Sequence, residues 1–267
     1  MNDVSRLRVT LDTNVCDILH EPEKAPALME PDSARRLRQA IEEGAILAFV
    51  AEASLFVECL DFKDKLEYLA VAGTVAPRPS ANPRFMERLR GLGAIGVRIL
   101  RGPLLGGEIF VPYLEYADDV DFTAAERTRR FGEFARHRPG RKPVMAFGQQ
   151  LLDQQPPLPS ATSVKTGPDS THWELRQDWA IAIKRAWDNA DASGQKALRK
   201  QVAPLIGEWC DTLIVAAHYG YGNNLFCTAD EGRGAGRNSI LFHENRSKLQ
   251  EDGIVVVSPM ELARRLL

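Results

Sequence analysis

Near the start of the chain the sequence runs Arg8-Val9-Thr10-Leu11-Asp12. The alternation of apolar and polar residues predicts a short β-strand that places Val9 and Leu11 on one face and ends at Asp12. Further along, the apolar run Ile46–Val50 predicts a second strand, and the segment Ser54–Leu60 that follows it has helical apolar spacing. The N-terminal part of the chain is therefore expected to form a strand-then-helix unit.

The C-terminal part of the chain has the same pattern. Asp211 is predicted to open an apolar helix that ends near Gly220, before the expected strand Leu225–Thr228. A β-branched strand, Ile254–Val257, is followed by the capping box Ser258-Pro259-Met260-Glu261, which starts the last helix. Alternating strands and helices predict an α/β fold whose parallel sheet is covered on both faces.

The segment between these two parts differs in texture and carries most of the prolines. We expect residues 1–60 and 205–267 to form the core and residues 61–204 to form a mostly helical insertion. Within the insertion, Thr123-Ala124-Ala125-Glu126 is a capping box that should start a helix reaching about His137. Further helices are expected at Trp173–Ala190 and Gln195–Ile206, and loops at Pro77–Pro83 and Pro156–Pro168.

Composition limits the classes of protein that this chain can belong to. Its 267 residues allow one large domain or two small ones. A content of 44% apolar and 26% charged residues disfavours disorder, collagen-like repeats and a coiled coil. The 34 basic and 36 acidic side chains give a net charge of −2, so any binding of nucleic acid requires a local basic surface.

The sequence has no pattern typical of a membrane-spanning segment or of a disulfide-rich protein. The longest apolar run, Ala45–Ala51, is far shorter than the roughly 20 residues that span a bilayer, and the N-terminus lacks a signal-peptide core. We therefore expect a cytoplasmic protein without a membrane partner. The cysteines have no metal-binding spacing and are predicted to be small buried side chains: Cys16, Cys59, Cys210 and Cys227.

Four acids follow the expected strands in a way that predicts their meeting. In an open parallel sheet, ligands bind outside the carboxyl ends of the strands. Asp12 and Asp230 leave strand ends, Glu58 lies early in a helix that leaves one, and Asp211 is predicted to begin a helix at the same edge. The sequence thus predicts one acidic pocket. Clustered carboxylates repel unless they share a cation, and oxygen ligands favour Mg²⁺ or Mn²⁺, which can activate water for phosphodiester hydrolysis.

These residues resemble the PIN-domain nucleases. The family's hydrophobic-Asp-Thr-Asn motif is similar to Leu11-Asp12-Thr13-Asn14, its acid after the second strand to Glu58, and its Thr-x-Asp to Thr228-Ala229-Asp230. The acid that opens an apolar helix is similar to Asp211 in Asp211-Thr212-Leu213-Ile214. The resemblance covers about residues 7–60 and 205–267, and it departs from the family in the long insertion and in the glycine-rich segment Glu231–Arg237.

The resemblance implies a PIN-like three-layer fold and a metal-dependent endoribonuclease that hydrolyses RNA. Asp12, Asp211 and Asp230 would hold Mg²⁺ or Mn²⁺, and Glu58 would complete the ligand shell or orient the attacking water. A toxin with an antitoxin or other protein partner, an RNA-processing enzyme and a defence enzyme all fit this reading. The alternative is a catalytically silent PIN-fold module that binds RNA or protein.

Each acid also has a simpler structural interpretation. Asp12 and Asp211 are favourable helix N-cap residues, and Glu58 borders an apolar stripe from which it could extend to solvent. Glu52 competes with Glu58 for the second position, although an acid directly after a strand often serves only the helix dipole. Asn14 is expected to hydrogen-bond Asp12 or a metal-bound water, and Thr228 to orient its loop. His218 is expected on a helix surface.

Two groups of basic residues are candidates for RNA contact. The run Arg127–Lys142 is strongly basic and contains Phe131 and Phe134, which favours either a phosphate-binding surface or a solvated helix face. The second group lies in the glycine-rich loop beside Asp230. The candidate nucleic-acid contacts, besides Asn14, are Arg129, Arg130, Arg138, Arg141, Arg233 and Arg237.

Overall fold

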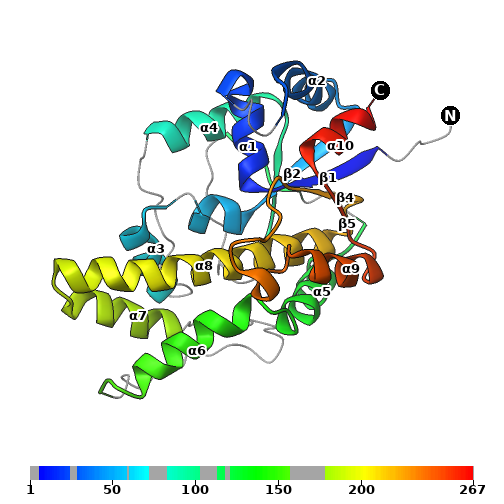
Figure 1. The fold of residues 1–267 in the computed structure, drawn as a ribbon. Helices are drawn as coiled ribbons and strands as arrows, with labels where there is room; N and C mark the ends of the chain where they lie inside the picture. The colour runs from blue at the N-terminus through cyan, green and yellow to red at the C-terminus, as the bar shows by residue number, and fades with distance from the viewer. Residues whose placement is uncertain are drawn as a thin grey trace.

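A computed structural model describes residues 6–24, 29–58, 60–71, 83–102, 113–117, 121–156 and 178–266. Its centre is one sheet of five parallel strands in the order β3-β2-β1-β4-β5 (Figure 1). The strands are β1 (Leu7–Leu11), β2 (Ile46–Ala51), β3 (Arg98–Leu100), β4 (Leu225–Cys227) and β5 (Val255–Val257). The predicted α/β class and parallel sheet are confirmed.

Helices cover both faces of this sheet and extend beyond it. The α-helices are α1 (Thr13–His20), α2 (Pro31–Glu42), α3 (Phe62–Val71), α4 (Pro83–Ala94), α5 (Ala124–Arg136), α6 (Arg141–Leu152), α7 (Asp178–Asn189), α8 (Ala192–Tyr221), α9 (His243–Glu251) and α10 (Pro259–Arg264). Short turns are η1 (Pro22–Lys24), the π-helical η2 (Ser54–Glu58) and η3 (Gly236–Asn238).

The helices divide into two layers and an outlying group. In Figure 1, α1, α2, α4 and α10 lie on one side of the sheet, and α5, α8 and α9 lie on the other. The first half of α8 extends away from the sheet and packs with α6 and α7, and α7 packs with α3. This arrangement is consistent with a three-layer core plus helical additions. The segment 61–204 also supplies β3, which pairs in parallel with β2 at one edge of the sheet.

The register of the strands aligns their carboxyl ends. Leu11 of β1 pairs with Val50 of β2 on one side and with Cys227 of β4 on the other. The next residue of each strand segment, Asp12, Ala51 and Thr228, therefore lies at the same level along the strand direction. Most residues of β1, β2, β3 and β4 are buried because apolar residues occupy both faces, as expected for a parallel sheet between helix layers, whereas Val255 of the edge strand β5 is exposed. The residues that leave β1, β2 and β4 are therefore brought to one edge.

Helix α8 corrects the expected boundaries in the second half of the chain. The helices predicted separately at Gln195–Ile206 and from Asp211 are one helix of 30 residues, which continues through Pro204. Asp191 caps its start, and Gly222 ends it with a φ of 63°. Asp211 therefore lies inside the helix and does not open it. The long apolar surface that α8 presents to the sheet and to α5 outweighs the local cost of an internal proline.

Two buried groups further define the core. His218 is buried, contrary to the expected surface position, because α8 packs directly on the sheet. Its Nδ1 lies 2.9 Å from Thr10 Oγ1, and burial lowers its pKa to about 3, so the ring is neutral. Three predicted buried cysteines, Cys16, Cys210 and Cys227, are confirmed, and Cys59 lies outside the described residues. In the part of the chain that is described, no helix has the length and apolar character needed to cross a bilayer.

Candidate functional site

Asp12 occupies the carboxyl end of β1 and is buried. It caps α1, as its structural interpretation predicts, by accepting a hydrogen bond from Thr13 N at 2.7 Å with Oδ1. Its Oδ2 accepts bonds from Thr228 Oγ1 at 2.6 Å and from Asn14 Nδ2 at 2.8 Å. The residue thus combines a capping role with a carboxylate that is fixed in place from two strands of the sheet.

Asn14 and Thr228 connect the N-terminal motif to the loop after β4. Asn14 donates to Asp12, which confirms one of its two predicted contacts, and its Oδ1 accepts from Ala229 N at 2.9 Å. Thr228 Oγ1 accepts from Asp230 N at 2.9 Å while it donates to Asp12. The two motifs, far apart in the sequence, therefore form one hydrogen-bonded unit.

Asp230 lies on the exposed side of this unit. Its Oδ1 accepts from Gly232 N at 2.8 Å, and the Arg246 side chain of α9 donates to its backbone carbonyl oxygen. Gly232 has a φ of 66°, and a Cβ there would meet Phe242 N at 2.5 Å. The loop that holds Asp230 therefore depends on a glycine at position 232.

Burial and the charge of Asp230 both act on the Asp12 carboxyl. Burial raises the pKa of Asp12 above its ordinary value, and the nearby charge of Asp230 raises it further. The hydrogen bonds from Thr228, Thr13 and Asn14 act in the opposite direction because they stabilise the ionised form. A divalent cation shared by the two carboxylates would remove the repulsion, and carboxylate oxygens suit Mg²⁺ or Mn²⁺, so this pair fits such an ion.

Glu208 is a third acid at this site that the sequence reasoning missed. Burial raises its pKa, and the charge of Asp230 adds to the rise, whereas a hydrogen bond from Ser239 opposes it. Its Oε2 is buried and has no hydrogen-bond partner among the residues that the structure describes. Glu208 was hidden because it falls between the two helices that the sequence predicts, whereas in the structure both belong to α8.

The other two predicted acids are less closely described. Asp211 is half-buried in α8, three residues after Glu208, on a neighbouring position of the same helix face. Glu58 ends η2, which packs against α1 and α8, but its side chain lies outside the described residues. Within the described side chains, no group of three Asp, Glu, His or Cys residues is arranged to hold a metal ion. The four-acid pocket stays a prediction.

Glu52, the competing acid, lies in a different environment at the same edge. It is buried after β2, and its Oε2 accepts a hydrogen bond from Gly102 N at 2.6 Å, beyond the end of β3. Burial raises its pKa to about 7, against hydrogen bonds from Gly102 and Tyr116 and the charge of Arg101. Glu52 thus connects the end of β2 to the segment that follows β3.

The basic run contributes fewer free cations than its sequence suggests. Arg130 donates to Tyr219 O at 2.8 Å and stacks on Phe122 and Tyr219, and Arg141 is buried. Arg129 pairs with Glu133 on the same exposed helix face, and Arg138 pairs with Asp252 while it lies over Phe134. Arg130 and Arg141 are therefore packed into the structure, whereas Arg138 lines a cavity between the α5–α6 junction and α9.

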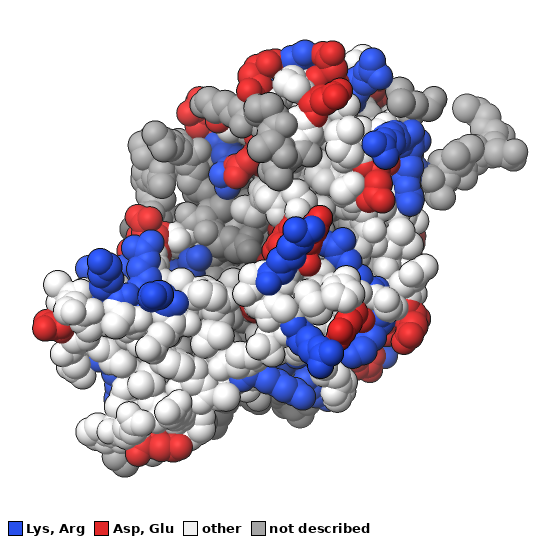
Figure 2. Space-filling view, viewed as in Figure 1, with Lys and Arg blue, Asp and Glu red and all other residues white. Residues whose placement is uncertain are grey.

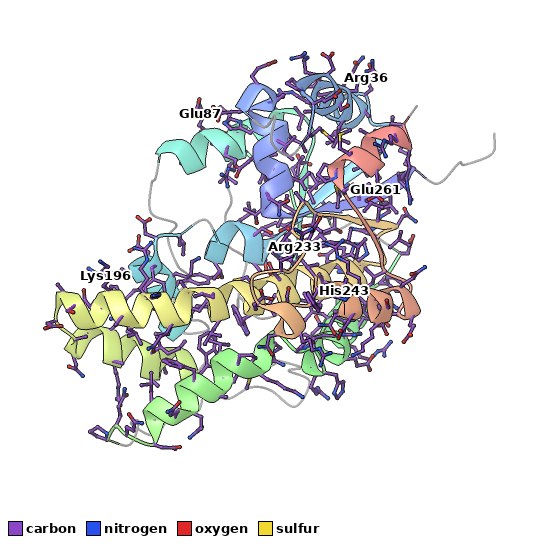
Figure 3. The ribbon with its side chains drawn as sticks, viewed as in Figure 1. Arg36, Glu87, Lys196, Arg233, His243 and Glu261 are labelled. Carbon is purple, nitrogen blue, oxygen red and sulfur yellow. The ribbon has the colours of Figure 1, made fainter. Side chains whose placement is uncertain are left out.

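The two arginines of the glycine-rich loop are exposed. Arg233 pairs with Glu231, and Arg237 pairs with Glu244 of α9 at 3.1 Å. Figure 3 shows Arg233 on the loop between the sheet and α9, on the side of the molecule where His243 begins that helix. Both side chains are 83% exposed, so a ligand at this surface can reach them.

Comparisons with known proteins identify no relative of the chain. No family model, no curated protein and no solved structure matches it.

Proposed function

We propose that the protein is a metal-dependent endoribonuclease that hydrolyses RNA phosphodiester bonds at the carboxyl edge of its sheet. The observation that carries this proposal is the pair of Asp12 and Asp230. A buried carboxylate, fixed by three donors, has its pKa raised further by a second carboxylate in the loop that follows the adjoining strand β4. An arrangement that costs stability in the absence of a cation is typical of a cation-binding site.

The residues have distinct roles in this proposal. Asp12 and Asp230 would hold Mg²⁺ or Mn²⁺, with Asp211 as the predicted third ligand and Glu208 as a further oxygen donor. Thr228 and Asn14 keep the Asp12 carboxylate in one orientation, so that little reorganisation is needed when substrate arrives. Glu58 is the candidate for orienting the attacking water. The ion, when bound, supplies a water of lowered pKa and stabilises the charge that develops on the phosphate.

The substrate side of the proposal rests on charge. The exposed Arg233 and Arg237 follow Asp230 in the chain, and they are the cations that would contact a phosphate backbone bound at this edge. Both arginines have acidic partners on the protein surface, and exposed pairs of this kind are weak enough for a phosphate to replace them.

The test is cleavage of a single-stranded RNA by the purified chain with Mn²⁺ or Mg²⁺ and with excess EDTA. We expect cleavage that needs the metal and that is abolished in Asp12→Asn. Cleavage in EDTA, or normal cleavage by Asp12→Asn, contradicts the proposal. Binding of RNA without metal-dependent cleavage would instead support the alternative of a catalytically silent module.

A further inference from the structure

A cavity of about 360 Å³ lies beside the candidate site, between the α5–α6 junction and the start of α9. One wall is formed by residues of the α5–α6 junction, and the other by residues of η3 and α9 and by Ile240 between them. The first wall consists of His137, Arg138, Pro139, Lys142 and Pro143. Its size is that of a small-ligand pocket. Figure 2 shows Lys and Arg side chains gathered over this junction, with acidic side chains between them.

The lining of this cavity is basic. Its lining residues include one acid, Glu244, and four basic residues: Arg138, Lys142, Arg237 and Lys248. Glu244 is engaged by Arg237, and Arg138 is engaged by Asp252. Lys142 and Lys248 are exposed, and within the described part of the chain neither has an acidic partner. The cavity therefore has two lysines free to bind an anion.

The cavity adjoins the acidic site through Glu208. Gly140 lies in the chain between the wall residues Pro139 and Lys142, and it is so close to α8 that a Cβ on it would lie 2.3 Å from the Glu208 backbone oxygen. Ser239, between two residues of the second wall, donates to the Glu208 carboxylate, which senses the charge of Asp230. Both walls thus contact α8 at Glu208, the acid that borders Asp12 and Asp230. A single-stranded RNA bound at Asp230 would therefore need to extend only a short way to enter the cavity.

We propose that this cavity is a phosphate subsite that holds one nucleotide of the RNA strand a few positions from the scissile bond. The proposal rests on the proposed function. Lys142 and Lys248 contact the phosphate, Arg237 exchanges Glu244 for it, and the prolines at 139 and 143 give the sugar an apolar wall. In this proposal the phosphate is bound where α6 meets α9, and Arg129 on the exposed face of α5 is not one of its contacts.

The experiment measures binding of a fluorescein-labelled single-stranded RNA by anisotropy, in EDTA, across a range of salt concentrations. The test variant is Lys142→Gln/Lys248→Gln, and the matched control is Lys196→Gln/Lys200→Gln. The control removes the same charge from exposed lysines at the outer end of α8, where Figure 3 places Lys196. All four lysines are exposed, so folding should persist, and thermal melts check this.

We expect the cavity variant to bind RNA about three- to tenfold more weakly at low salt, and the slope of log affinity against log salt to fall by up to about 1.4 for two lost phosphate contacts. The control should retain the wild-type slope. Equal losses of affinity in both variants, or an unchanged affinity of the cavity variant, overturn the subsite. Either result would favour an acidic protein as the partner of this surface.

Parallel cleavage assays with Mn²⁺ separate the two proposals. If the protein cleaves RNA but the cavity variant binds RNA as well as wild type, the subsite alone is overturned. If RNA binding depends on the cavity lysines but no cleavage occurs, the nuclease alone is overturned.

Discussion

Two buried acids lie at the carboxyl edge of the sheet, Asp12 after β1 and Glu52 after β2, and their surroundings differ. Asp12 receives hydrogen bonds from three polar residues and faces a second carboxylate, Asp230. Glu52 receives bonds from a backbone amide and a tyrosine, with an arginine as its charged neighbour. Burial raises both pKa values, so a raised pKa alone does not distinguish a site from a structural acid. The neighbouring like charge does.

The sharpest separation of the two acids is expected in RNA cleavage. Asp12→Asn should lower metal-dependent cleavage by about a thousandfold or more, because it removes a ligand of the ion that stabilises the reacting phosphate. Its melting temperature should be unchanged or higher, because one repelling carboxylate is gone. Glu52→Gln should cleave within about twofold of wild type. Equal losses of activity in both variants would remove the distinction between the two acids.

The second difference concerns the pH dependence of stability. The pKa of Glu52 is raised from 4.5 to about 7, so between these values the folded protein holds a proton that the unfolded chain has lost. Stability therefore falls as pH rises through this window, by about 3 kcal/mol in total, and the cost is constant above it. Glu52→Gln should be more stable than wild type by up to this amount at pH 8 and equal to it near pH 4.5.

The measurement is urea unfolding of both proteins at several pH values, with the exposed Glu87→Gln as a control (Figure 3). Glutamine can still accept the bond from Gly102 N, so the folded geometry should persist. A Glu52→Gln variant that is less stable than wild type at pH 8 would mean that the ionised side chain is a required partner of Arg101.

These differences also indicate what the sequence could and could not predict. The strands β1, β2, β4 and β5 follow from apolar patterns bounded by polar residues, and their parallel arrangement brings Asp12, Glu52 and Asp230 to one edge. The hydrogen bond between Asn14 and Asp12 was predicted from the N-terminal motif, whereas the bond from Thr228 to Asp12 was not predicted. Local sequence patterns were sufficient to predict the residues whose positions depend on a single strand or helix start.

Features that depend on packing between distant segments were not predictable in the same way. The sequence predicted separate helices at Gln195–Ile206 and from Asp211, whereas burial of α8 against the sheet and α5 makes them one helix. Glu208 was missed as a result. The basic run offered no local sign that Arg130 would bind the Tyr219 carbonyl oxygen, because that contact exists only once α5 packs on α8.

A third difference is expected in the response to metal. An ion that binds only the folded protein stabilises it by about 2.7 kcal/mol when its concentration is a hundredfold above its dissociation constant. Mn²⁺ should therefore raise the melting temperature of the wild type and of Glu52→Gln, but hardly that of Asp12→Asn. Calorimetry with Mn²⁺ and with EDTA measures this, and an equal shift in Asp12→Asn would place the ion away from Asp12.

The smallest expected effect concerns Glu208, which borders the acidic pair without belonging to either motif. Glu208→Gln should lower cleavage and the affinity for Mn²⁺ by about tenfold, in the range found for residues that support metal ligands. Its apo stability should not fall, because burial and Asp230 disfavour the ionised form that the substitution removes. Ser239→Ala is the matched control: it removes the donor to Glu208 but leaves the carboxylate, so we expect a loss of cleavage of only about twofold. If Glu208→Gln keeps full activity and Mn²⁺ affinity, Glu208 is a packing residue of α8, and the ligands beyond Asp12 and Asp230 must then be sought at Asp211 and Glu58.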